Sequence, residues 1–167
     1  MGDIGLEKRG DTYYLYKWTG KFALVEVLNS AHKGEIYEFP SFKVAVPFKV
    51  GHRKLEIMQA VIINPPTLHP FIGSSSYEIK SICFGSSQKI YDKERSKGDI
   101  PALLRALEIA VQMIREGYGK GARPYRTAHE CRVKKITYQE AVRRKIPITN
   151  INDPDVKKLL EKWRRRK

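Results

Sequence analysis

The apolar residues change their spacing halfway along the chain, and this change limits the folds that the sequence can adopt. Up to residue 63 they form short runs rich in aromatic and β-branched side chains, with strict alternation around Val44, Val46 and Phe48. From residue 99 onward they recur every three or four residues. Alternation is typical of strands, whereas a spacing of three to four is typical of helices. Strands followed by helices predict an α+β domain.

Four strands are expected in the first half of the chain, over residues 13–18, 22–28, 36–50 and 55–63. The first two are separated by Thr19-Gly20-Lys21, which is typical of a tight hairpin turn. We therefore predict an antiparallel four-stranded meander, followed by a loop and by helices that pack on the sheet.

Three helices are expected in the second half. The first begins with the capping residue Asp99 and ends before Gly117. A short second helix begins with Thr137 and Glu140, which have the spacing of a capping box. The last helix begins at Asp153, which a proline follows in the first helical position.

The chain is strongly basic, with a formal net charge of +14 over 167 residues. Much of this charge lies in the last quarter of the sequence. Such a stretch is either a solvated helix face with a basic tail or a surface that binds nucleic acid or an acidic protein. The residues that would form this basic surface are Arg143, Arg144, Lys145, Arg164, Arg165 and Arg166.

The sequence carries no apolar run long enough to cross a bilayer and no secretory signal, so we expect a cytoplasmic protein with no membrane partner. Its two cysteines, Cys83 and Cys131, do not form the dense disulfide framework of a small secreted domain. Whether these two cysteines pair with each other stays open.

Cys83 follows a proline-rich loop that contains His69-Pro70. A thiol becomes a useful nucleophile when it is partly exposed and when positive charge or a helix N-terminus favours the thiolate. Lys80 and Lys89 flank the cysteine, and the helix after Asp99 could direct its N-terminus toward the loop. Alternatively, Cys83 belongs to a short buried strand, since unpaired cysteines are among the most buried residues.

Five short motifs follow one another in order between Phe42 and Arg126. They are Val46-Pro47-Phe48, Ile62-Ile63-Asn64-Pro65-Pro66, His69-Pro70-Phe71-Ile72, Ser81-Ile82-Cys83-Phe84-Gly85 and the helix over 103–114. Their order and spacing resemble the core of the ubiquitin-conjugating enzymes, most closely the prokaryotic members. We divide the chain accordingly into an N-terminal extension (1–11), a domain with this fold (12–133) and a basic helical C-terminal extension (134–167).

The resemblance implies that Cys83 accepts a ubiquitin-like modifier from an activating enzyme as a thioester and passes it to an amine or a thiol. The protein would then be an acyl (aminoacyl) transferase of a prokaryotic or viral pathway, without a cofactor. His69, the second catalytic candidate, would orient the loop. The alternative is a non-catalytic module of the same fold that binds a protein partner or nucleic acid through its basic surface.

The sequence departs from the family pattern in three places. Phe71 stands where the family has asparagine, so the donor expected to stabilise an oxyanion must come from elsewhere, with Ser76, Ser86 and Ser87 as candidates. The interval between His69 and the cysteine is longer than usual, and the long N-terminal helix of the family is missing. The phenylalanine and the missing helix favour the non-catalytic alternative.

Metal-ligating residue types occur together at His129-Glu130-Cys131. No second pair of histidines or cysteines has the spacing of a structural zinc site. On this basis the sequence predicts no metal site.

Overall fold

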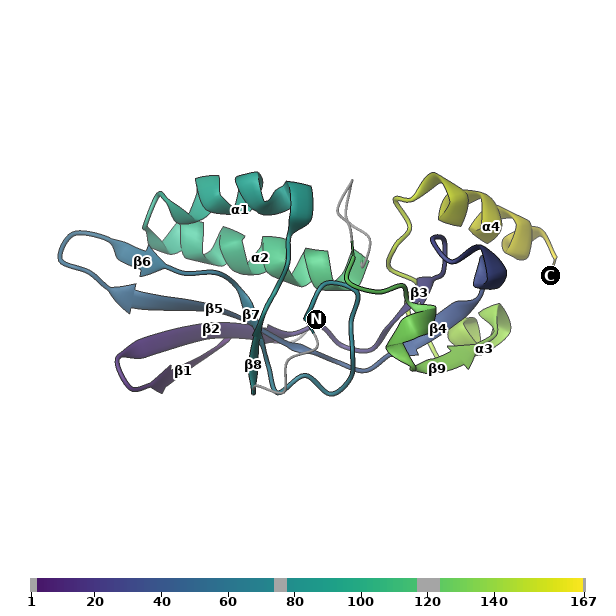
Figure 1. Ribbon diagram of the computed structural model, residues 1–167, viewed down its shortest axis with the longest axis horizontal. Coiled ribbons are helices and arrows are strands. Elements are labelled where there is room, and N and C mark those ends of the chain that lie inside the picture. The colour runs from purple at the N-terminus through teal and green to yellow at the C-terminus, as the bar shows by residue number, and fades with distance from the viewer. Residues whose placement is uncertain (1–2, 74–77, 117–123, 167) are drawn as a thin grey trace.

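The computed structural model describes residues 3–73, 78–116 and 124–166, and within them it shows two antiparallel sheets and four α-helices. The prediction of an α+β fold is confirmed. The molecule is elongated, with the larger sheet at one end and the smaller sheet at the other (Figure 1). Among the described helices, none combines the length and the apolar character needed to cross a membrane.

The larger sheet has the strand order β1-β2-β5-β7-β8, and β6 also pairs with β5. Its strands are β1 (Gly5–Arg9), β2 (Thr12–Trp18), β5 (Lys43–Val50), β6 (Leu55–Ile57), β7 (Val61–Ile63) and β8 (Ile79–Ser81). Because β1 pairs with β2, residues 5–9, which lie in the predicted N-terminal extension, form an edge strand of this sheet. The smaller sheet has the order β3-β4-β9, with strands β3 (Phe22–Val25), β4 (Ile36–Phe39) and β9 (Lys134–Ile136).

The two sheets share one long antiparallel ribbon. In the larger sheet Trp18 faces Lys43, and in the smaller sheet Phe22 faces Phe39. Three residues therefore separate the two ladders on each side of the ribbon, and the register is preserved across the interruption. Consequently β2 and β3 form one kinked strand, which pairs with the kinked strand formed by β4 and β5.

The predicted hairpin turn at Thr19-Gly20-Lys21 is wrong. The Thr19 N–H donates to the Phe42 carbonyl, and the Phe42 N–H donates to the Thr19 hydroxyl, both at 3.0 Å, so hydrogen bonding continues across the gap. Gly20, with φ of +72°, provides the kink. The chain reverses only after β3, in a loop that contains the 3₁₀ helix η1 (Ser30–His32).

The three predicted helices are confirmed as α2 (Ile100–Glu116), α3 (Tyr138–Arg143) and α4 (Pro154–Arg165). The Asp99 carboxylate accepts the Ala102 N–H at 2.8 Å at the start of α2, and the capping box before α3 is complete. The predicted end of α2 at Gly117 lies outside the described residues.

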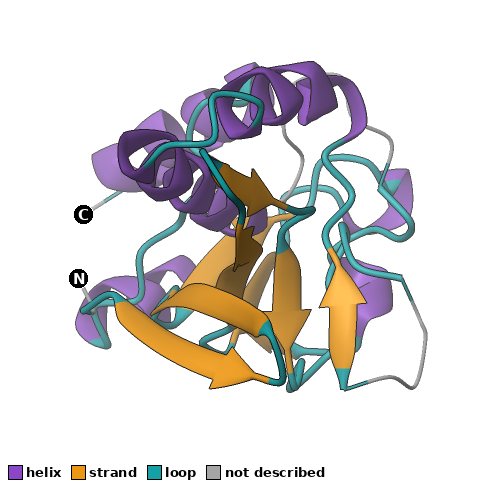
Figure 2. Cartoon of the chain, turned by 90° about the vertical axis from the view of Figure 1, so that its left-hand side faces the viewer, coloured by secondary structure: helices purple, strands orange, loops and turns teal. Residues whose placement is uncertain are grey.

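A fourth helix, α1 (Gln88–Arg95), was not predicted. Its sequence, QKIYDKER, buries only Tyr91, and so it carries no apolar periodicity that would indicate a helix. Helix α2 packs on β2 and β5, and α1 packs on α2. Figure 2, in which this end of the molecule faces the viewer, shows the strands twisted beneath the helices.

The main hydrophobic core lies between the larger sheet and the helices α1 and α2, and Phe42, Phe71, Phe84 and Leu107 are among its buried side chains. A second core joins the smaller sheet to α3 and α4. It consists of Ala23, Val25, Ile36, Ile136, Ala141, Ile146, Val156 and Leu160. Residues 134–167, predicted as a C-terminal extension, therefore contribute one strand and two helices to this second core.

Candidate functional site

Cys83 lies two residues after β8, where the chain leaves the larger sheet and approaches α1. The residue is half-buried, between the buried side chains of Ile82 and Phe84. Its N–H donates to the Phe71 carbonyl at 2.9 Å. The backbone of Cys83 is therefore fixed, while the residue itself retains access to solvent.

The fold brings the His-Pro segment alongside the cysteine segment. Ile72 and Ile82 form an isolated antiparallel bridge, next to the hydrogen bond between Cys83 and Phe71. On the other side, the Gln59 side chain donates to the Ile82 carbonyl at 2.9 Å. The two motifs that the sequence singled out thus form one local structure.

His69 is fully buried and uses both ring nitrogens. Its Nε2 lies 2.7 Å from the Ile114 carbonyl, and its Nδ1 accepts the Phe71 N–H at 3.0 Å. These partners fix the tautomer, with the proton on Nε2. Burial, together with the nearby Arg126 guanidinium, lowers the pKa of His69 to about 4, although the hydrogen bond to Ile114 opposes this shift. A neutral imidazole with both nitrogens engaged orients the loop and is not placed to accept a proton from the thiol.

Phe71 contributes its backbone but not its side chain to the site. The ring is fully buried and its centroid lies 6.3 Å from that of His69. A buried phenyl ring has no donor for an oxyanion, in contrast to the amide expected from the family pattern.

Two residues far along the chain, Tyr125 and Arg126, hydrogen-bond to the backbone of the His-Pro loop. The Arg126 guanidinium donates to the carbonyls of His69 and Ile72, each at 2.6 Å, and the Tyr125 N–H donates to the Pro70 carbonyl at 2.8 Å. Sequence reasoning missed both residues, because one arginine after a glycine-rich stretch carries no pattern that marks a structural role.

Replacing Arg126 by alanine should leave two loop carbonyls without their charged donor and should lower the free energy of unfolding by about 2 to 3 kcal/mol. Urea denaturation would show a lower midpoint with an unchanged slope. Arg143→Ala, an exposed position in the last turn of α3, is the matched control and should change stability by less than about 0.5 kcal/mol. Equal effects of the two substitutions would contradict the role given to Arg126.

The three candidate serines fall in different places. Ser76 lies outside the described residues. Ser86 and Ser87 belong to the 3₁₀ helix η2 (Gly85–Ser87), which directly follows the Cys83-Phe84 step, and the Ser87 hydroxyl does not cap α1. These two serines are thus the candidates nearest to the thiol along the chain.

The helix whose N-terminus lies closest to Cys83 along the chain is α1, which begins five residues later. The sequence left open whether helix α2 directs its N-terminus toward the loop, and it does not. The bond from His69 to the Ile114 carbonyl places the C-terminal end of α2 beside the loop instead. The periodicity of α2 predicted its length correctly but contains no information about its direction relative to the loop.

Both cysteines are free thiols. Cys131 is buried, its Sγ lies 3.4 Å from the Thr127 carbonyl, and burial raises its pKa to about 12. The two thiols therefore differ sharply in environment.

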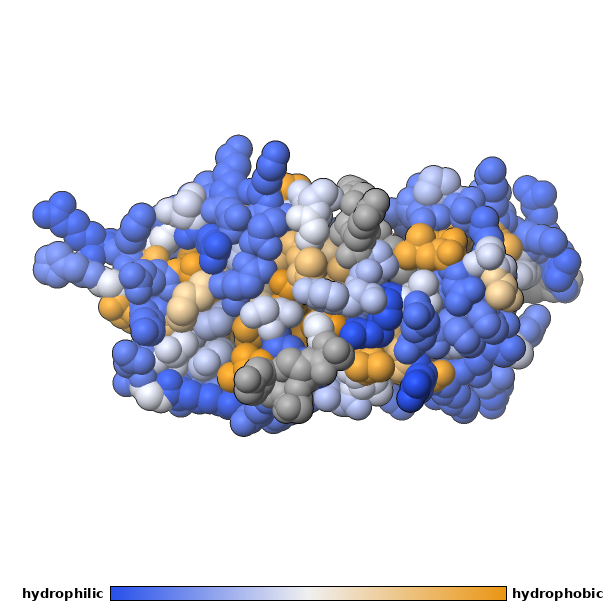
Figure 3. Space-filling view, in the orientation of Figure 1, coloured by the Kyte–Doolittle hydropathy of each residue, from blue (hydrophilic) through white to orange (hydrophobic). Residues whose placement is uncertain are grey.

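The basic residues of the C-terminal region are not equivalent. Arg144 forms two hydrogen bonds with the Glu38 carboxylate, at 2.7 and 2.8 Å, which attach α3 to β4 and lower the pKa of Glu38. The other five, Arg143, Lys145, Arg164, Arg165 and Arg166, are exposed. They lie on or directly after α3 and α4, which touch through Tyr138 and Trp163, and Figure 3 shows a largely hydrophilic surface over these helices.

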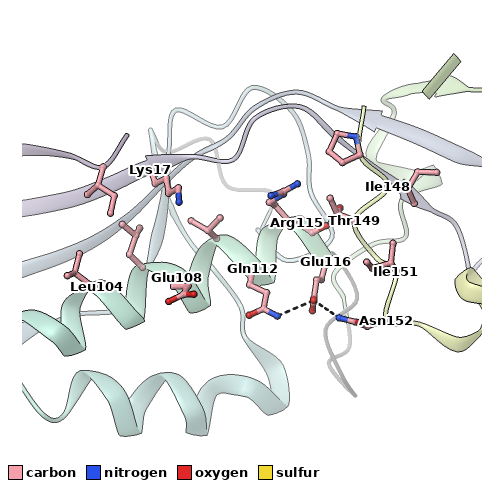
Figure 4. A pocket seen from close by; sticks show the side chains of 14 residues that line it. Lys17, Leu104, Glu108, Gln112, Arg115, Glu116, Ile148, Thr149, Ile151 and Asn152 are labelled. Atoms are coloured by element: carbon pink, nitrogen blue, oxygen red, sulfur yellow. Dashed lines mark hydrogen bonds between the residues drawn. The ribbon is translucent and has the colours of Figure 1, made fainter. Parts of the chain in front are cut away.

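A cavity of about 710 Å³ lies between α2 and the segment 147–152. Figure 4 shows Gln112 and Asn152 donating to the Glu116 carboxylate at its edge, at 3.1 and 2.9 Å. A smaller cavity of about 140 Å³ is lined by Phe84, Ser87 and residues of α1 and α2. Cys83 lines neither cavity, although its neighbour Phe84 and the candidate Ser87 line the smaller one.

Comparison with family models, with curated proteins and with solved structures identified no match to this chain. The resemblance to the ubiquitin-conjugating enzymes therefore depends on the motifs in the sequence alone.

Proposed function

We propose that this protein is a thioester carrier of the ubiquitin-conjugating type, with Cys83 as the nucleophile, acting in a reducing cytoplasm. The proposal is carried by one observation: the half-buried Cys83 is held by its own backbone N–H against the His-Pro segment. Its partners would be a ubiquitin-like modifier and the enzyme that activates it.

The chemistry requires two acyl transfers. The Cys83 thiolate attacks the thioester carbonyl of the activated modifier, a new C–S bond forms, and the old C–S bond breaks so that the thiolate of the activating enzyme leaves. An amine or a second thiol then attacks the modifier on Cys83 and releases its proton to solvent, and the C–S bond to Cys83 breaks with the Cys83 thiolate as the leaving group. The neutral, fully engaged His69 supports the loop in both steps and exchanges no proton.

The absence of an amide at position 71 affects the two transfers differently. Loss of one oxyanion donor typically costs a factor of about 100 to 1,000 in rate. Exchange between thiols tolerates this loss better, since a thiolate is a strong nucleophile, whereas attack by an amine depends on stabilisation of the tetrahedral intermediate. We therefore expect Cys83 to load readily and to discharge to amines slowly, unless Ser86, Ser87 or a partner supplies the donor.

The test uses a fluorescent peptide that ends in Gly-Gly and carries a C-terminal mercaptoethanesulfonate thioester. The folded protein should acquire one peptide per chain, removable by dithiothreitol, whereas Cys83→Ala should acquire none. Cys83→Ser should give either no adduct or an ester that resists dithiothreitol. Cys131→Ala is the matched control and should load like the unmodified protein. An adduct that persists in Cys83→Ala would rule out the assignment.

The non-catalytic alternative is favoured by the buried ring of Phe71 and by the five exposed basic residues at α3 and α4. It predicts binding of a nucleic acid whose affinity falls steeply as salt is added, because phosphate neutralisation releases counterions. Reversal of charge at Arg164 and Arg165 should then abolish binding of a single-stranded oligonucleotide. Salt-insensitive binding would contradict this alternative.

A further inference from the structure

Three potential metal ligands from distant parts of the sequence meet at the smaller sheet. They are His32 in η1, Glu35 just before β4, and His129 in the 3₁₀ helix η3 (His129–Cys131). Their potential ligand atoms all lie within 4.8 Å of one another. The His32 Nδ1 lies 2.9 Å from a Glu35 carboxylate oxygen, and the two imidazole rings stack with centroids 3.5 Å apart.

The hydroxyl of Tyr37 also belongs to this cluster. It lies 2.7 Å from the His129 Nδ1 and contacts the Glu35 carboxylate. Burial, followed by these carboxylate contacts, raises the pKa of the phenol, so the hydroxyl stays protonated. The ammonium group of Lys135 also lies near the cluster, with its Nζ 3.5 Å from the second carboxylate oxygen of Glu35.

A buried carboxylate holds the two histidine segments in place. Glu26 is fully buried, and one of its oxygens accepts the His129 N–H at 2.8 Å. The other oxygen accepts the N–H groups of Leu28 and Asn29, at 3.0 and 3.1 Å. The Asn29 side chain in turn accepts the Ala31 N–H and caps η1, which carries His32. Such second-sphere support orients ligands and places negative charge near them.

We propose that His32, Glu35 and His129 form a binding site for one divalent transition-metal ion of the zinc class. Two imidazoles and one carboxylate are ligands that zinc prefers, and tetrahedral coordination at zinc separates the ligand atoms by about 3.4 Å. The His32 Nδ1 lies 2.9 Å from the Glu35 carboxylate and no separation exceeds 4.8 Å, so the ligand atoms are near this spacing. Ligation requires the two imidazole rings to turn out of their stack, so that the ion lies in the plane of both. Three protein ligands leave a fourth position open, beside the Tyr37 hydroxyl, for water or a substrate atom.

The residues next to His129 do not belong to this site. The Glu130 carboxylate accepts the Thr127 N–H at 2.9 Å, and the Cys131 thiol lies against the Thr127 carbonyl. The motif at 129–131 therefore contributes one ligand, and the other two come from a segment about a hundred residues earlier. For this reason the spacing of histidines and cysteines along the sequence did not predict the site.

Zinc titration of the untagged, chelator-treated full chain tests the proposal. Calorimetry should give one Zn²⁺ per chain, and His32→Ala and His129→Ala should each weaken binding at least about 100-fold, since loss of even an outer-sphere partner costs about 10- to 100-fold. His52→Ala is the matched control, because His52 lies in the exposed turn between β5 and β6, and it should leave the affinity unchanged.

The same cluster could be a hydrogen-bonded network that binds no ion, and this alternative predicts different results. In that case zinc would not bind to the unmodified chain, or it would bind equally to the His129→Ala variant, and either result would overturn the proposal. Co²⁺ added to the unmodified protein gives a readout that does not depend on folding of the variants. Intense visible absorption typical of four-coordinate cobalt is expected, and the weak spectrum of hydrated cobalt would contradict the site.

Discussion

Iodoacetamide is expected to alkylate Cys83 in the folded protein at least about 100-fold faster than Cys131. Alkylation proceeds through the thiolate and requires access for the reagent. Cys131 is 2% exposed and its pKa is raised to about 12, so at pH 8 only about one molecule in 10,000 carries its thiolate. Cys83 is half-buried and free. Mass spectrometry of peptides taken at successive times would measure both rates.

Denatured protein provides the control for this experiment, since both cysteines should then react at similar rates. Cys131→Ala should show the same rate at Cys83 as the unmodified protein. If Cys83 in the native protein reacts as slowly as Cys131, the Cys83 thiol is inaccessible to the reagent and the thioester proposal fails. The non-catalytic alternative would then be the better description of the protein.

His69→Ala is expected to lower the free energy of unfolding by about 3 to 5 kcal/mol. The substitution removes the partners of the Ile114 carbonyl and the Phe71 N–H, both bonded to the ring at 3.0 Å or less. It also leaves a cavity beside the ring of Phe42, whose centroid lies 5.3 Å from the imidazole. Since whole domains are stable by about 5 to 15 kcal/mol, this loss should be plain in urea denaturation.

The contribution of His69 should also appear in the way the free energy of unfolding changes with pH. The pKa of His69 is lowered to about 4 in the folded protein, below the value of about 6.5 expected when unfolded, so the unfolded chain binds the proton more tightly. The stability contributed by the neutral imidazole is complete above pH 6.5 and is lost as pH falls toward 4, by up to about 3 kcal/mol. The stability curve of His69→Gln, which can still donate and accept, should be flatter in this window.

His52→Ala, in an exposed turn, is the control for both experiments and should match the unmodified protein. A similar acid sensitivity in His69→Gln would assign the loss of stability to other groups. The carboxyls whose pKa is lowered, such as Glu38, contribute stability that is lost only below about pH 4.5. The range from 6.5 to 4.5 therefore separates His69 from these carboxyls, and the comparison with His69→Gln separates it from the other histidines.

The sequence by itself determined the α+β class and three of the four described helices. These features depend on local rules. Each of the signals that gave the helices acts within a few residues, and so it can be recognised in a single sequence. These signals are the Asp99 cap, the Thr137–Glu140 capping box and the apolar spacing of α2.

Only the tertiary structure decided how these segments meet. Three features depend on partners far away in the sequence. They are the kink at Gly20 where a turn was predicted, the hydrogen bonds from Arg126 to the His-Pro loop, and the ring contact between His32 and His129. Such pairs leave no periodic signal, because packing of the whole core selects them rather than any local preference. Both the thiol loop and the proposed metal site arise from these long-range contacts.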